Sequence, residues 1–111
     1  MFFNRNKCAS LSMTQAALEL ENNASIHLVD VRSPQEYHMG HIPNSVNLPL
    51  ENIAHIAGHV PDKDARIFVY CLSGARSRAA CTQLIRLGYT QVFNIGGIGQ
   101  WRGKIERSRG A

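Results

Sequence analysis

An apolar, β-branched run that stops at a cysteine is the feature that most constrains how this chain folds. The stretch IFVYCLSGARSRAA covers residues 67–80, with the cysteine at position 71. The apolar residues predict a buried strand, the small residues around Gly74 predict a tight turn, and the alanine-rich continuation predicts a helix. This order places the thiol of Cys71 at the carboxyl end of a strand, facing a helix N-terminus.

Such a strand end suits an anion, because successive backbone N–H groups and the helix N-terminus point at it. The same field lowers the pKa of a cysteine and favours the nucleophilic thiolate. Gly74 can adopt the positive φ that a tight turn of amides requires. Ser73 and Ser77 offer hydroxyl donors, and Arg76 offers a guanidinium for an oxyanion. Simpler interpretations stay open: Ser77 as the N-cap of the helix, and Arg76 as an exposed residue of its first turn.

The length of 111 residues suits a single domain that covers residues 1–111. Residues 1–7 are expected to form a flexible lead-in and residues 106–111 a tail. No apolar run approaches the roughly 20 residues that span a bilayer, and the first residues lack the apolar stretch of a signal peptide. We therefore expect a cytoplasmic protein that has no membrane partner.

The basic residues and the cysteines narrow the choice of partners. The formal net charge of +4 does not come from one basic block, so small anions are expected rather than nucleic acid. The three cysteines, Cys8, Cys71 and Cys81, are widely spaced, a pattern that predicts neither a disulfide framework nor a metal site. Cys81 is predicted to be a buried thiol, and the sequence leaves open whether Cys8 or Cys81 has a redox role.

Three motifs carry a resemblance to a known family. The stretch from Cys71 resembles the active-site loop of the rhodanese superfamily, in which a cysteine opens a six-residue loop that carries a persulfide. Two further stretches resemble that family's other signatures, namely VDVRSPQEYHMGHIPNSVNLP at residues 29–49 and NIGGIGQW at residues 94–101. The motifs follow the family's order, so the chain is similar to a single-domain rhodanese from about residue 12 to residue 101.

Strands that alternate with helices predict a parallel sheet covered on both faces. The resemblance implies the same α/β architecture, with three α/β/α layers and a five-stranded parallel sheet. The strand candidates are residues 8–11, 26–31, 45–48, 67–70 and 91–95. The helix candidates are residues 12–23, 33–40, 51–57, 77–87 and 98–105.

The resemblance also implies a function, that of a thiosulfate sulfurtransferase-like transferase without cofactor or metal. In that chemistry the Cys71 thiolate takes a sulfane sulfur from thiosulfate or another donor, becomes a persulfide, and passes the sulfur to a thiophilic acceptor. The expected partners are small sulfur-containing anions and thiol acceptors, with a protein-borne persulfide as a further candidate donor. The expected persulfide-binding loop consists of Leu72, Ser73, Gly74, Ala75, Arg76 and Ser77.

Residues outside the loop are expected to support it, and one residue inside the loop departs from the family pattern. Asp30 is expected to hydrogen-bond the loop from behind, and Arg32 to pair with Glu36 across the following turn. Leu72 stands where many rhodanese loops place a basic residue. A leucine contacts an anion only through its backbone N–H, so the loop is less suited to thiosulfate and better suited to a protein-borne persulfide or a thiol partner.

Two other functions are compatible with the same residues. A cysteine phosphatase resembles a Cys-x5-Arg pattern, whereas four residues separate Cys71 from Arg76, and this shorter loop suits one sulfur atom better than a phosphoryl group. A persulfide carrier without turnover, or a protein-binding regulatory module, would use the same fold, although the presence of Cys71 argues against a purely structural role. The sequence does not identify the physiological donor and acceptor or the oligomeric state.

Overall fold

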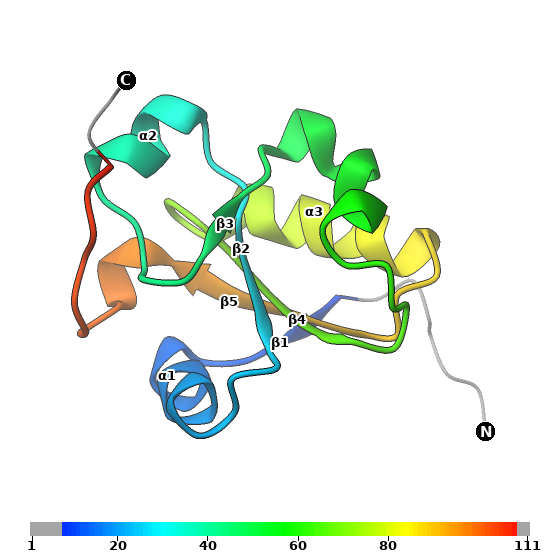
Figure 1. The fold of residues 1–111 in the computed structure, drawn as a ribbon, viewed down its shortest axis with the longest axis horizontal. Coiled ribbons are helices and arrows are strands. Elements are labelled where there is room, and N and C mark those ends of the chain that lie inside the picture. Colours follow the sequence, from blue (N-terminus) through cyan, green and yellow to red (C-terminus); the bar gives the residue numbers. More distant parts are fainter. Residues whose placement is uncertain (1–7, 109–111) are drawn as a thin grey trace.

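The computed structural model describes residues 8–108 and contains a five-stranded sheet between two layers of helices (Figure 1). Each pairing of neighbouring strands is parallel. The order across the sheet is β1-β5-β4-β2-β3. The strands are β1 (Ala9–Ser10), β2 (His27–Asp30), β3 (Val46–Asn47), β4 (Arg66–Cys71) and β5 (Gln91–Gly97). The predicted α/β fold is confirmed, and the predicted lead-in at residues 1–7 lies outside the described residues.

The helices follow most of the sequence signals. They are α1 (Met13–Asn22), α2 (Pro34–Met39) and α3 (Ala75–Arg86), with 3-10 helices η1 (Leu50–Gly58) and η2 (Ile98–Gln100). Ser12 caps α1 by accepting the Gln15 N–H at 3.1 Å, and Ser33 forms a reciprocal capping box with Glu36. Within residues 8–108, no helix combines the length and apolar character needed to cross a membrane.

Two predicted helix boundaries are wrong. The helix predicted over residues 98–105 is helical only over η2, after which Trp101 takes an extended conformation. Glycines at positions 99 and 103 explain the early end, because glycine is the weakest helix former after proline. The helix α3 begins at Ala75, two residues before the predicted start.

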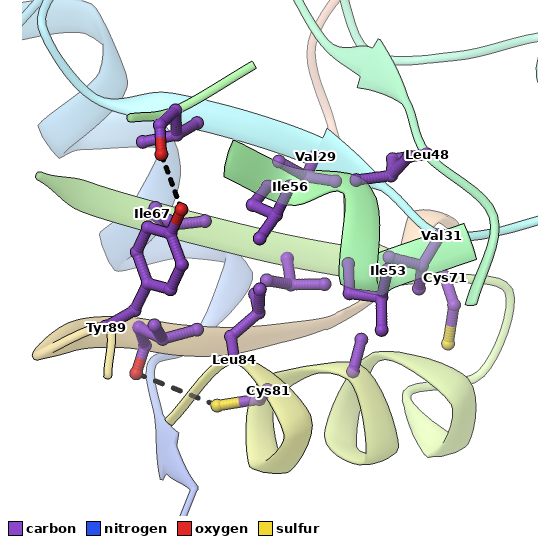
Figure 2. Close-up of a cluster of buried hydrophobic side chains, with 14 residues drawn as sticks. Val29, Val31, Leu48, Ile53, Ile56, Ile67, Cys71, Cys81, Leu84 and Tyr89 are labelled. Carbon is purple, nitrogen blue, oxygen red and sulfur yellow. Dashed lines mark hydrogen bonds between the residues drawn. The ribbon is translucent and has the colours of Figure 1, made fainter. Parts of the chain in front are cut away.

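The central strand β4 divides the interior into two clusters. Successive side chains of a strand point to opposite faces, so Ile67, Val69 and Cys71 face the layer of α3 and η1. Phe68 and Tyr70 face the opposite cluster, which includes the buried residues of α1. Figure 2 shows the first cluster, with Cys71 at its edge where the strand ends. Cys71 is therefore buried in the core, while the next two residues along the chain are exposed.

The carboxyl ends of β2, β4 and β5 meet at one edge of the sheet. Tyr70 lies opposite Asp30 of β2, and Cys71 lies opposite Gly97 of β5. Ligand sites in parallel α/β sheets lie at this edge. The predicted tail is described up to residue 108. It pairs with the segment that follows α2, where Glu106 and His41 exchange backbone hydrogen bonds of 2.8 and 2.9 Å.

Cys8 and Cys81 form a disulfide, with a Cα–Cα distance of 5.6 Å and a separation of 73 positions along the chain. The predictions of no disulfide and of a free Cys81 thiol are wrong. Spacing along the sequence did not reveal the pair, because β1 and α3 come together only by packing on the same strand, β5. Cys71 is the free cysteine, and the disulfide ties the edge of the sheet to the helix that follows the cysteine loop.

Reduction of the disulfide is expected to lower the free energy of unfolding by about 2–4 kcal/mol, because the bond closes a long loop in the unfolded chain. Urea unfolding of the wild type with and without dithiothreitol measures the effect, which should be a lower midpoint in the reductant. The Cys8→Ser variant is the control, and its midpoint should not respond to dithiothreitol. A wild-type midpoint that is the same in both buffers would contradict a stabilising disulfide.

Candidate functional site

Cys71 ends β4, and the loop of residues 72–77 turns back over its sulfur. The Gly74 N–H donates to Cys71 Sγ at 2.9 Å, and the Ser77 hydroxyl oxygen lies 3.4 Å from the same sulfur. Gly74 is the residue that precedes α3 and has a φ of 100°, a conformation that glycine adopts at little cost. The turn therefore aims a backbone N–H and the start of a helix at a buried thiol.

The pKa of the Cys71 thiol is shifted downward. Burial alone raises it, because a thiolate loses its hydration in the interior. The Ser77 hydroxyl and the backbone N–H groups of Ser77, Gly74 and Ser73 stabilise the thiolate and lower the pKa by more than burial raises it. Three residues of the loop, Ser73, Gly74 and Ser77, thus provide the donors that were expected around the sulfur.

Gly97 lets the loop lie directly on β5. A Cβ atom at position 97 would stand 3.1 Å from Ser73 Cα and would overlap the Leu72 carbonyl oxygen. Both contacts are with backbone, which cannot move aside as the end of a flexible side chain can. The second glycine of the NIGGIGQW motif is therefore explained by close approach of the loop, and any side chain here would displace the loop from the sulfur.

Arg76 has a different partner from the one expected. Its guanidinium donates to both carboxylate oxygens of Glu36, at 2.7 and 2.9 Å. These hydrogen bonds, together with the capping interactions of Ser33, lower the pKa of Glu36 to about 2 although partial burial opposes the shift. A bidentate ion pair therefore joins the first turn of α3 to the first turn of α2.

Asp30 and Arg32 also pair differently from the prediction. Asp30 accepts the backbone N–H of Arg32 at 2.9 Å and the Arg32 guanidinium at 2.7 Å, so its carboxylate does not hydrogen-bond the loop. Arg32 also donates to the Gly40 carbonyl at 2.6 Å and does not pair with Glu36. Arg32 and Asp30 are both buried, which explains the pairing, because a buried charge requires a close partner. They fix the segment between β2 and α2.

The remaining loop residues divide between surface and interior. Leu72 is 56 % exposed, Ser73 is exposed, and Ala75 is the exposed first residue of α3. Ser77 lies inside the first turn of α3 and is fully buried. It is not the N-cap of the helix, because Gly74 holds that position. The structure brings Cys71, Gly74 and Ser77 together.

Asn94 is a site residue that sequence reasoning missed. Its side chain donates to the Gly74 carbonyl at 3.1 Å and accepts the Ser77 hydroxyl at 2.6 Å. The available signal was its place in the NIGGIGQW motif, two residues before Gly96, because a polar residue inside an otherwise apolar strand needs a partner.

A well-formed hollow lies away from the cysteine loop. It has a volume of about 1060 Å³ and is lined by α1, by residues 42–44 and by residues 100–104. No residue of the loop lines it, and the adjoining cluster lies on the face of the sheet opposite to Cys71. This hollow therefore does not belong to the cysteine site at the end of β4.

A buried thiol whose pKa is lowered by a hydroxyl and by backbone N–H groups, at the end of the central strand of a parallel sheet, is suited to nucleophilic chemistry. Comparison with known proteins gives the family: a model of the Rhodanese-like domain matches residues 12–104. The chain is 39% identical over 97 residues to a sulfurtransferase of Allochromatium vinosum, a match that covers 86% of this chain and 87% of that protein. The chain belongs to the rhodanese family and is a sulfurtransferase at the level that the family defines.

Two further comparisons, one of sequence and one of structure, identify the same family. The chain is 41% identical over 76 residues to the thiosulfate sulfurtransferase PspE of Escherichia coli, a match that covers 68% of this chain and 73% of PspE. A solved structure described as an E. coli rhodanese with anions superposes with a TM-score of 0.71 at 36% identity, covering 74% of this chain and 98% of that one. The predictions of a rhodanese fold and of a rhodanese-type transferase are confirmed.

The ion pair between Glu36 and Arg76 is expected to stabilise the fold by about 1 kcal/mol at most, because both side chains are partly exposed. The pKa of folded Glu36, about 2, lies below its ordinary value of 4.5. The contribution is therefore complete above the ordinary value and is lost as the pH falls toward 2. Urea unfolding should show Glu36→Gln to be less stable than the wild type at pH 7, with the difference shrinking over that interval.

The matched control is Glu19→Gln, which removes the ion pair of Glu19 with Arg66, 2.7 Å long and remote from the loop in sequence. Both variants should lose a similar amount of stability. Only Glu36→Gln should change the rate at which iodoacetamide alkylates Cys71, because only that pair holds the loop. Equal alkylation rates in the two variants would show that the Glu36–Arg76 ion pair does not affect the reactivity of Cys71.

Proposed function

We propose that this protein transfers a sulfane sulfur from a donor to a thiophilic acceptor through a persulfide on Cys71. The observation that carries the proposal is the Cys71 sulfur itself, which is buried, receives the Gly74 N–H at 2.9 Å and lies 3.4 Å from the Ser77 hydroxyl. These donors lower the pKa of the thiol and so favour the nucleophilic form. The same donors suit the terminal sulfur of a persulfide anion.

The proposed reaction is a double displacement. The Cys71 thiolate attacks the outer sulfur of thiosulfate, the sulfur–sulfur bond of the donor breaks, and sulfite leaves with the bonding electron pair. An acceptor such as cyanide or a thiolate then attacks the terminal sulfur of the persulfide, and the Cys71 thiolate leaves. No proton is transferred to or from Cys71 in either step if it begins as a thiolate, so the loop supplies electrostatic stabilisation and needs no general base.

The proposed role of the other loop residues follows from their partners. Gly74 supplies a backbone donor, Ser77 supplies a hydroxyl, and Arg76 holds the loop in place through Glu36 rather than binding the departing sulfite. Because the guanidinium of Arg76 is already paired with a carboxylate, it offers little net charge to a dianion.

The proposed donor class follows from Leu72 at the mouth of the site. Its side chain is 56 % exposed and stands beside Cys71 in the sequence, so the mouth is apolar where a cation would attract thiosulfate. We include small sulfur-containing anions, thiol acceptors and a protein-borne persulfide among the partners, and the apolar mouth favours the last. We also propose a cytoplasmic location. Thiols are kept reduced there, so the Cys8–Cys81 disulfide would form only under oxidising conditions.

Replacement of Cys71 by serine is expected to lower sulfur transfer from thiosulfate to cyanide by more than about a thousandfold, because the nucleophile is removed. Intact-mass measurement after thiosulfate treatment should show one added sulfur atom on the wild type and none on Cys71→Ser. The controls are Cys8→Ser and Cys81→Ser, which should gain the sulfur and keep most of the turnover.

Substantial activity in Cys71→Ser would overturn the assignment of the nucleophile. A wild type that gains the sulfur atom but transfers none to cyanide or to thiols would contradict turnover and favour a persulfide carrier. Phosphate-ester hydrolysis that depends on Cys71 would favour the phosphatase instead.

Introduction of a positive charge at position 72 is expected to lower the KM for thiosulfate. Leu72→Arg should lower it about fivefold at low salt, because two unit charges 4 Å apart in water attract each other by about 1 kcal/mol. The gain should shrink as salt rises and screens the attraction. The matched control is Leu87→Arg, which adds the same charge at the far end of α3, where Leu87 is 40 % exposed. An equal KM in Leu72→Arg and Leu87→Arg would show that position 72 does not face the donor.

A further inference from the structure

Asn94 lies in β5 at the point where the pairing of β5 with β4 changes register. Val69 of β4 lies opposite Asn94, but the next residue, Tyr70, lies opposite Gly96, so Ile95 is an extra residue in the ladder. Such a bulge bends the strand and re-aims the side chains beside it. Asn94 is 8 % exposed, and its side chain reaches the cysteine loop rather than a neighbouring strand.

The orientation of the Asn94 amide is fixed by two backbone groups. Its Nδ2 donates to the Gly74 carbonyl at 3.1 Å, and its Oδ1 accepts the Gly96 N–H at 2.9 Å. A carbonyl can only accept and a backbone N–H can only donate, so the amide cannot be reversed without losing both hydrogen bonds. Oδ1 therefore faces Ser77, whose hydroxyl donates to it at 2.6 Å.

The Ser77 hydroxyl has one proton and three acceptors within reach. These are Asn94 Oδ1 at 2.6 Å, the Gly74 carbonyl at 3.1 Å and Cys71 Sγ at 3.4 Å. While the hydroxyl donates to Asn94, one of its lone pairs is left for the sulfur, an arrangement that suits a protonated thiol. A thiolate is an acceptor and needs the proton turned toward it. The Ser77 hydroxyl is therefore expected to donate to an oxygen when Cys71 is protonated and to the sulfur when Cys71 is a thiolate.

The geometry points to Asn94 as a positioning residue that keeps the Ser77 hydroxyl proton available to the Cys71 sulfur. Nδ2 of Asn94 already supplies a donor to the Gly74 carbonyl, and the Gly96 N–H already supplies a donor to Oδ1. The hydroxyl can thus turn to the sulfur without leaving either buried oxygen unsatisfied, which would be costly. The inference rests on the proposed thiolate chemistry of Cys71, and Asn94 itself does not touch the sulfur in these contacts.

Without the asparagine amide, the Gly74 carbonyl keeps the Arg78 N–H at 3.1 Å but loses its second donor, and a lone pair of its oxygen is left for the Ser77 hydroxyl. The Ser77 hydroxyl then remains on that carbonyl, which is nearer to it than the sulfur is, and the thiolate loses a hydrogen bond. Asn94→Ala is therefore expected to raise the pKa of Cys71 by about 1. The rate of alkylation of the full chain by iodoacetamide, followed from pH 5 to pH 10 by intact mass, measures this pKa.

The control is Asn22→Ala, which removes an asparagine from α1, where its side chain donates to the Leu18 carbonyl at 2.9 Å. Its alkylation profile should match that of the wild type. Asn94→Asp is a second variant, with a side chain of the same size. It allows the rise in the pKa of Cys71 to be measured if Asn94→Ala does not fold. The aspartate retains the acceptor oxygens, loses the donor to Gly74 and adds a negative charge, so the pKa of Cys71 should rise further.

A double-mutant cycle tests whether Asn94 acts through Ser77. Ser77→Ala should itself raise the pKa of Cys71, and Asn94→Ala added to it should raise the pKa no further. A residue that merely supports the loop would instead add its effect in both backgrounds. Additive shifts, or an unchanged pKa in Asn94→Ala and in Asn94→Asp, would overturn the inference.

Failure of this inference and failure of the proposed function give different results. Alkylation requires no sulfur donor, so it reports on the Asn94 inference alone. A wild type that gains no sulfur from thiosulfate and transfers none would contradict the proposed function while leaving the alkylation profiles intact.

Discussion

The cysteine site depends on the return of residues 72–77 over the end of their own strand. Two backbone positions permit this path: Gly74 takes a φ of 100°, and Gly97 leaves the space that the carbonyl of Leu72 occupies. The first position turns the chain so that an N–H faces the sulfur, and the second lets the turned chain rest on β5. A side chain at position 97 would push the loop outward and separate the donors from the thiolate, so the pKa of Cys71 is controlled by residues of a neighbouring strand as well as by its own loop.

The charges around the site serve mainly to hold the backbone in place. Arg76 is paired with Glu36 and Arg32 with Asp30, so each of these guanidinium groups is matched by a carboxylate. What stabilises a negative sulfur is a set of neutral dipoles, the N–H groups of the loop and the hydroxyl of Ser77. Fixed dipoles need little reorganisation when the charge on sulfur changes, whereas free cations would bind the oxygen atoms of an anionic donor. In the proposed reaction, these dipoles would stabilise the negative charge on the transferred sulfur more than the charge on the departing sulfite.

Local patterns in the sequence determined most of what could be predicted. The order of strands and helices, the central strand before the cysteine loop, and the helix starts near residues 12 and 33 depend on neighbours in the chain, and the structure has them within one or two residues of the predicted positions. Two helix boundaries and the partner of Asp30 were predicted wrongly although they are local in the sequence. The other wrong predictions concern partners far apart in the sequence. Glu36 lies four residues from Arg32 but pairs with Arg76, and Cys8 pairs with Cys81. Asn94 was missed for the same reason, because its partners Gly74 and Ser77 become neighbours only when β5 packs beside the loop.

The disulfide between Cys8 and Cys81 makes most of the molecule a closed covalent ring. The ring contains β2, β4 and the start of α3, and hence the cysteine and its loop, while β5 and the carboxyl-terminal segment extend from it. A chain with this topology tolerates one break of its backbone between the two cysteines without separating into fragments. A nick in the exposed turn at residues 62–64, for example, would leave β2 and β4 attached to a single molecule through the sulfur–sulfur bond. Under oxidising conditions, such a cut would therefore release no fragment, and the two pieces would separate only after reduction of the disulfide.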